Sequence, residues 1–163
     1  MRRAPTARSL FRAAARGFTA SGEILNAAEV SGSLSVALLQ AGDAGEALAA
    51  VEGVARVFEL AGDRHRQALA LGNEAAALRA LGRIQPALAK YQESAELLRQ
   101  VGDQDARAHV LKSISEIQLR QGKQLEALAT MDAALNNRKK LSFVERLLKK
   151  LLKIPFQMLN RGG

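Results

Sequence analysis

The chain has 163 residues, enough for one compact domain or one short repeat array, and 48% of them are hydrophobic, so a continuous core can form. Aromatic residues make up only 4%, and the absence of cysteine excludes disulfides and thiolate metal sites. The formal charge of +8 comes from the ends: residues 1–21 carry +5, residues 136–163 carry +7, and residues 22–135 carry −4. An acidic middle disfavours nucleic acid as the partner, and no apolar run is long enough for a membrane span.

The first predicted element covers residues 5–21, which contain arginines but no acidic residue. Such a segment is typical of a mitochondrial presequence. Its residues, however, keep a forty-residue register with the chain that follows, because Phe11 aligns with Val51 and Phe18 with Phe58. A disposable leader has no reason to keep this register. We therefore interpret 5–21 as a half-repeat helix, with a presequence in residues 1–18 as the alternative.

Glycine recurs every forty residues in two interleaved series. The first series is Gly42, Gly82, Gly122 and Gly162, and the second is Gly22, Gly62 and Gly102. A fixed period of this size is the signature of a repeat array. We predict three repeats, over 23–63, 64–103 and 104–142.

Each repeat holds two helical patterns, which are clearest in 64–103. Apolar residues recur there at three- and four-residue steps before Gly82, and again between Gly82 and Gly102. This favours two helices that each end at a glycine, with Asp103 placed to cap the next helix. Because the connections are very short, neighbouring helices must be antiparallel.

The last predicted element covers 143–161 and is both apolar and basic. Its pattern is typical of helices that lie on an anionic membrane or dock in a partner's groove. The repeat register aligns Leu151 with Leu111 and favours instead a capping or half-repeat helix, which Pro155 would end or kink near Ile154.

Three sets of positions resemble the tetratricopeptide repeat (TPR) family. The small residues before the turn glycine are Ser35, Ala75 and Ser115, the alanines after it are Ala47, Ala87 and Ala127, and the large residues are Val51, Tyr91 and Met131. The forty-residue period resembles the longer subclass of the family. Glu74 departs from the family pattern, which has an apolar residue at that position. The resemblance implies an all-α fold, a right-handed α-solenoid of about eight helices in antiparallel pairs, forming one domain over 1–163.

Catalytic and metal-binding patterns are missing from the sequence. The two histidines, His65 and His109, have no metal-ligand spacing, and no nucleophile elbow or phosphate-binding loop is present. We expect no enzymatic activity, no cofactor and no metal.

The resemblance implies that the first helix of each repeat lines a concave groove that binds an extended peptide or a helix. The residues facing it would be Glu29, Gly32, Ser33, Val36 and Leu39 in the first repeat, Gly72, Asn73, Ala76, Arg79 and Ala80 in the second, and His109, Lys112, Ser113, Glu116 and Arg120 in the third. Among these, we expect the peptide to bind to Asn73, Arg79, His109, Lys112, Ser113, Glu116 and Arg120.

The groove becomes basic toward the C-terminus, which favours an acidic or mixed peptide as the partner. We therefore expect a protein-interaction scaffold, with the cytoplasm as its compartment, or the mitochondrial matrix if the presequence interpretation holds. The alternative is a self-assembly module, a homo-oligomer formed through terminal helices, because the end repeats of an array need a polar cap or a partner. Its contact residues would be Phe11, Phe18, Phe143 and Leu147.

Overall fold

The computed structural model describes residues 7–136, and every regular element in this part of the chain is an α-helix. The chain divides into two compact units, which are Met1–Val101 and Gly102–Gly163. In the first unit lie α1 (Ala7–Ala20), α2 (Ile24–Gln40), α3 (Ala44–Val51), α4 (Val54–Leu60), α5 (Arg64–Ala80) and α6 (Ile84–Val101). In the second lie α7 (Gln104–Arg120) and α8 (Gln124–Asn136).

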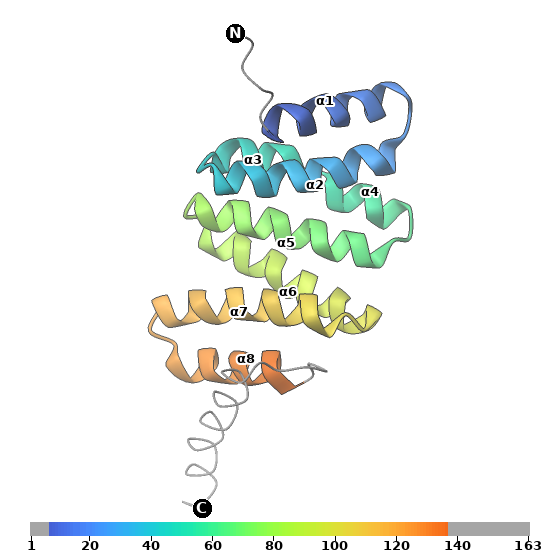
Figure 1. Cartoon of the computed structure of the whole chain (residues 1–163). Helices are drawn as coiled ribbons and strands as arrows, with labels where there is room; N and C mark the ends of the chain where they lie inside the picture. Colours follow the sequence, from blue (N-terminus) through green and yellow to red (C-terminus); the bar gives the residue numbers. More distant parts are fainter. Residues whose placement is uncertain (1–6, 137–163) are drawn as a thin grey trace, which may run out of the picture. The chain divides into compact units, whose positions relative to one another are not determined.

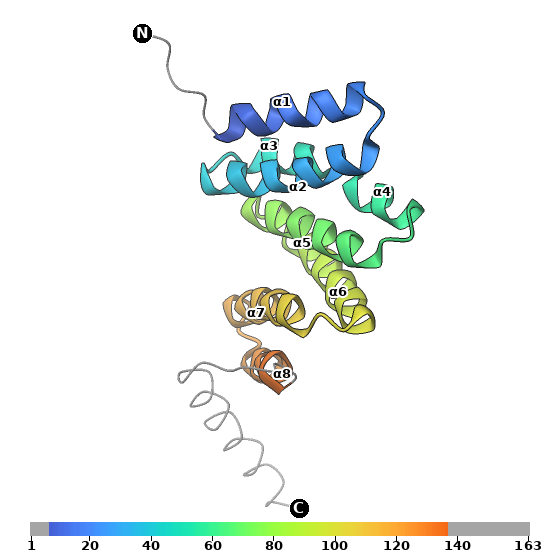
Figure 2. The ribbon, with the colours of Figure 1, turned by 45° about the vertical axis from the view of Figure 1, so that its right-hand side comes forward.

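Helices that follow one another pack as antiparallel pairs within each unit: α1 with α2, α2 with α3, α5 with α6, and α7 with α8 (Figure 1). In the first unit, α5 also packs against α2, α3 and α4. Figures 1 and 2 show α2 and α5 side by side and running in the same direction. The all-α, solenoid-type packing of helix pairs is therefore confirmed. The predicted helix over 143–161 lies outside the described residues.

Within residues 7–136, every glycine of the two forty-residue series has a positive φ and follows the end of a helix. At Gly82, where φ is +74°, the glycine N–H donates to the Arg79 carbonyl at 3.0 Å and the Arg83 N–H donates to the Leu78 carbonyl at 2.9 Å. This Schellman arrangement satisfies carbonyls that a helix end would otherwise leave free. The same pair of bonds recurs at Gly22, Gly42, Gly62 and Gly122.

Aspartates that follow two of these glycines begin the next helix. The Asp103 carboxylate accepts the Ala106 N–H at 2.9 Å, and the Asp63 carboxylate accepts the Arg66 N–H at 2.9 Å. The predicted cap at Asp103 is confirmed. Each bond satisfies one of the N–H groups that the first turn of a helix leaves without a partner.

The small residues of the repeat are fully buried between the helices. The alanines Ala47, Ala87 and Ala127 are each at most 1% exposed, and so are Ser35, Ala75 and Ser115. Glu74, which departs from the apolar pattern, is accommodated by an ion pair, because its carboxylate lies 3.2 Å from Nζ of Lys90 on α6.

The expected second helix of the first repeat is broken, so the prediction of one continuous helix there is wrong. Helix α3 ends at Val51, Glu52 turns to an extended backbone with ψ of 123°, and Gly53 takes a φ of +78° before α4 begins at Val54. The matching second helix of 64–103, α6, continues through Gln92 and Glu93 at the same register. A glycine in the middle of a helical pattern permits this break, whereas glutamine and glutamate propagate a helix.

Alanine at Gly82 is expected to lower the free energy of unfolding by about 1 kcal/mol, because a φ of +74° is strained for a residue with a Cβ. The control is Gly17→Ala in α1: at both glycines an added Cβ meets nothing within 4 Å, but Gly17 has no positive φ. Gly17→Ala should raise stability by up to about 1 kcal/mol. Chemical denaturation measures both, and changes of the same sign would contradict the turn assignment.

Two fully buried serines of the first unit provide a second matched pair. Ser94 Oγ donates to the Ala68 carbonyl at 2.7 Å, whereas Ser35 Oγ has no hydrogen-bond partner within the described residues. Ser94→Ala should therefore lower the free energy of unfolding by about 1 kcal/mol, and Ser35→Ala should leave it unchanged or raise it. Equal losses in urea denaturation of the two variants would show that the hydrogen bond at Ser94 does not carry the difference.

Candidate functional site

A pocket of about 250 Å³ opens between α2 and α5 in the first unit. The residues that line it are Ala28, Glu29, Gly32, Ser33 and Val36 from α2, Val54 and Phe58 from α4, and Arg66, Leu69, Ala70 and Asn73 from α5. The buried residues among them, Ala28, Val54, Phe58 and Ala70, form one hydrophobic cluster. The pocket therefore has an apolar floor and a rim that carries polar side chains.

Helix α4 supplies the large side chains of this floor. Phe58 and Val54 are 3% and 7% exposed, and their neighbours in the cluster, Ala28 of α2 and Ala70 of α5, are small. These four residues line the part of the pocket that lies between the two longer helices. The pocket thus depends on α4 lying beneath α2 and α5, and α4 begins at the break after Gly53.

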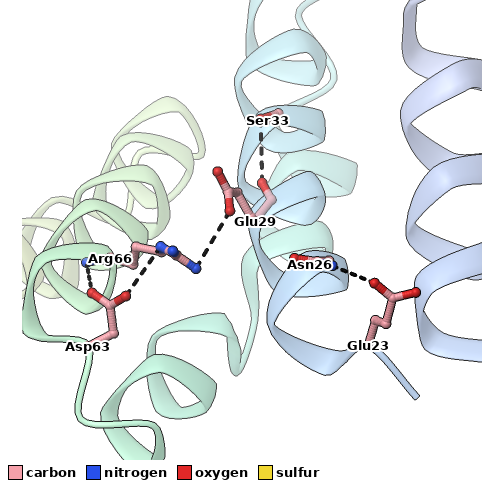
Figure 3. Close-up of polar contacts among 6 residues, drawn as sticks. All are labelled: Glu23, Asn26, Glu29, Ser33, Asp63 and Arg66. Atoms are coloured by element: carbon pink, nitrogen blue, oxygen red, sulfur yellow. Dashed lines mark hydrogen bonds and ion pairs between the residues drawn. The ribbon is translucent and has the colours of Figure 1, made fainter. Parts of the chain in front are cut away.

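At one end of the pocket, Arg66 lies between two carboxylates (Figure 3). Its guanidinium is 3.2 Å from Asp63, which also caps α5, and 3.6 Å from Glu29 on α2. The guanidinium carbon lies 5.8 Å from the centre of the Phe58 ring, within the range of a cation–π interaction. Arg66 is therefore held in place from three sides at the pocket rim.

Further along the pocket, Gly32 of α2 faces Asn73 of α5. A Cβ added at Gly32 would lie 3.4 Å from the Asn73 side-chain nitrogen, which is ordinary contact distance. The Asn73 side chain is half-buried, and within the described residues its amide forms no hydrogen bond. An amide with two donors and one acceptor is thus available at the rim.

The structure brings together five of the residues predicted to face the groove, because Glu29, Gly32, Ser33, Val36 and Asn73 all line this pocket. Arg79 lies on α5 beyond the pocket and is half-buried. His109, Lys112, Glu116 and Arg120 are exposed on α7, in the second unit. Ser113 is half-buried there, and its hydroxyl donates to the His109 carbonyl at 3.3 Å.

Two of the four residues predicted to mediate self-assembly lie within the described part of the chain. Phe11 and Phe18 on α1 are half-buried, and Phe11 packs against the buried cluster that contains Leu34 and Leu38. Phe143 and Leu147 lie outside the described residues.

Six pocket residues were absent from the sequence prediction: Ala28, Val54, Phe58, Arg66, Leu69 and Ala70. Val54 and Phe58 belong to a second helix of a repeat, whereas the prediction placed only first helices at the groove. The available signal was Gly53, a glycine inside a helical pattern, which marks a point where helix direction can change.

Among residues 7–136, no helix combines the length and the hydropathy that crossing a bilayer requires. In the same range, the structure contains no group of three or more His, Asp or Glu residues positioned to bind a metal ion.

Residues 66–140 match the family model described as tetratricopeptide repeat. The matched range begins in α5 and extends through α6, α7 and α8. No curated protein and no solved structure matches the chain.

Proposed function

We infer that this chain, whose residues 66–140 belong to the tetratricopeptide repeat family, is a scaffold that binds a peptide segment of another protein. The observation that carries the proposal is the open apolar pocket between α2 and α5. Its floor offers burial to an apolar side chain of the partner, and burial of apolar surface is the main favourable term in protein association. Polar groups at the rim would orient the bound segment.

Asn73 is the residue best suited to fix the peptide backbone. Its amide forms no hydrogen bond within the described residues and lies beside the apolar floor, so it could both donate to a backbone carbonyl and accept from a backbone N–H.

The acidic component of the partner would contact α7. Lys112 and Arg120 are exposed there, two turns apart on one side of the helix, with no ion pair to another described residue. Glu116 lies between them, so this surface carries both signs with one cation in excess. A segment of mixed charge, with carboxylates that meet Lys112 and Arg120, fits it best.

Peptides selected from a random display library on the purified chain test the pocket. Asn73→Leu should lower the affinity of the chain for the selected peptides about five- to tenfold, because it removes one hydrogen bond. Asn26→Leu is the control, because Asn26 bonds Glu23 at 2.6 Å and does not line the pocket. Calorimetric titration that gives equal affinities for wild type and Asn73→Leu would remove the site assignment.

The α7 contacts have their own test. For those selected peptides that contain Asp or Glu, Lys112→Glu and Arg120→Glu should each weaken binding by two- to fivefold at low salt, and the loss should shrink at 0.5 M salt. Lys123→Glu is the control, because Lys123 lies in the turn before α8 and pairs with Glu126 at 3.6 Å. Unchanged affinity in both α7 variants would exclude a role for these cations.

Self-association through α1 is the second candidate function, and the burial pattern favours it. Phe18 is half-buried, whereas its repeat equivalents Phe58 and Leu98 are 3% and 0% exposed. Leu10 on the same helix is 56% exposed. A second copy that covered α1 would bury the apolar surface that the inner helices bury within the chain.

Sedimentation equilibrium tests this second candidate. A mass above that of the monomer is expected at high concentration, and Leu10→Glu should lower it. Leu60→Glu is the control, because Leu60 is 72% exposed on α4. A monomeric wild-type chain across the concentration range would exclude self-association.

A further inference from the structure

The end of the pocket near the N-termini of α2 and α5 carries more negative than positive charge. Glu29 and Asp63 share the single guanidinium of Arg66, and Glu23 lies at the start of α2 (Figure 3). The neighbouring Arg64 is directed to α6, where it donates to Gln100 at 3.4 Å. Two carboxylates, Glu29 and Asp63, therefore flank the guanidinium of Arg66, whereas Glu23 lies on the side of α2 that faces α1.

The three carboxylates are not equally available to a ligand. Asp63 uses both oxygens on Arg66, one for the helix cap and one for the ion pair. Glu23 accepts hydrogen bonds from Ser21 at 3.0 Å and Asn26 at 2.6 Å. Glu29 has only the longer 3.6 Å contact to Arg66, its side chain is 62% exposed, and it lines the pocket itself. Glu29 is thus the carboxylate that a bound cation would meet.

The size of the pocket limits its occupant. A volume of about 250 Å³ lies below the roughly 300–1,000 Å³ of sites that enclose a drug-sized molecule, so it suits a single side chain. The exposed apolar side chains of Val36 and Leu69, each 41% exposed, extend the floor toward solvent. They offer contact to the stem of a longer neighbouring side chain, such as that of lysine.

We propose that the α2–α5 pocket recognises a peptide in which an apolar side chain stands next to a lysine or arginine. The apolar side chain lies on Phe58 and Val54, and the cation pairs with Glu29. The proposal rests on the proposed peptide-binding function and adds the partner's charge at this site. It assigns to the pocket a sign opposite to the one that Lys112 and Arg120 favour on α7.

Three short capped peptides that differ only in two positions test the rule. They present Leu-Lys, Leu-Glu or Ala-Lys in a Gly-Ser background, and are titrated into the full ¹⁵N-labelled chain at low salt while amide shifts of α2 and α5 are followed. Leu-Lys should bind roughly two- to fivefold tighter than Leu-Glu, which is the usual effect of one exposed ion pair. Leu-Lys should also bind tighter than Ala-Lys, because alanine buries less apolar surface.

Charge variants then identify the carboxylate. Glu29→Gln should abolish the preference for Leu-Lys over Leu-Glu. Glu59→Gln should keep it, because Glu59 is exposed on α4, pairs with Arg56 at 2.7 Å and does not line the pocket. Equal affinity of wild type for Leu-Lys and Leu-Glu, or the same preference in Glu29→Gln, would overturn the proposal.

An occlusion variant separates this failure from failure of the proposed function. Gly32→Leu places a side chain toward Asn73 across the pocket, and leucine favours the helix more than glycine does. If peptides bind without charge preference and Gly32→Leu abolishes their binding, the charge rule falls and the peptide-binding function stands. If no peptide changes the amide shifts of α2 or α5, or if Gly32→Leu binds the peptides as tightly as wild type does, both the site assignment and the charge rule are wrong.

Discussion

The left-handed turn at the end of each helix is the constraint on which the rest of the first unit depends. At Gly42, Gly62 and Gly82 the backbone reverses within two residues, and two N–H groups after each turn bond back into the preceding helix. A reversal this short forces the next helix to lie antiparallel against the last. Repetition of the turn then sets α2 and α5 side by side in the same direction, and small residues such as Ala47 and Ala75 are fully buried.

One further left-handed glycine makes the first repeat different from the second. Gly53 interrupts the second helix of the first repeat, and α4 begins directly after it. The equivalent helix of the second repeat, α6, is unbroken. The α4 side chains Val54 and Phe58 form one buried cluster with Ala28 and Ala70, and all four line the pocket. The pocket is therefore a consequence of two features together, a broken second helix and alanines on the facing first helices. The ion pairs of Arg66 then set the charge of one rim.

The sequence was sufficient for whatever depends on spacing. The glycine turns, the buried alanines and the Asp103 cap follow from residue type at a fixed period, because each reflects a local conformational rule. The family resemblance predicted that Asn73 and four α2 residues face the groove; all five line the pocket, and their role in binding stays a prediction. The break at Gly53 could not be derived in this way, since a glycine within a helix is tolerated or broken according to packing. Arg66 was missed because its position depends on Asp63 and on contacts with Glu29 and Phe58 from other helices.

The central claim is that α4 lies beneath both α2 and α5 and leaves the Phe58 ring at the floor of an open pocket. Nuclear Overhauser measurements on protein with labelled alanine methyl groups and phenylalanine rings test it most directly. The account predicts cross-peaks from the Phe58 ring to the methyl groups of both Ala28 and Ala70. Cross-peaks to only one of these helices, or to neither, would contradict it.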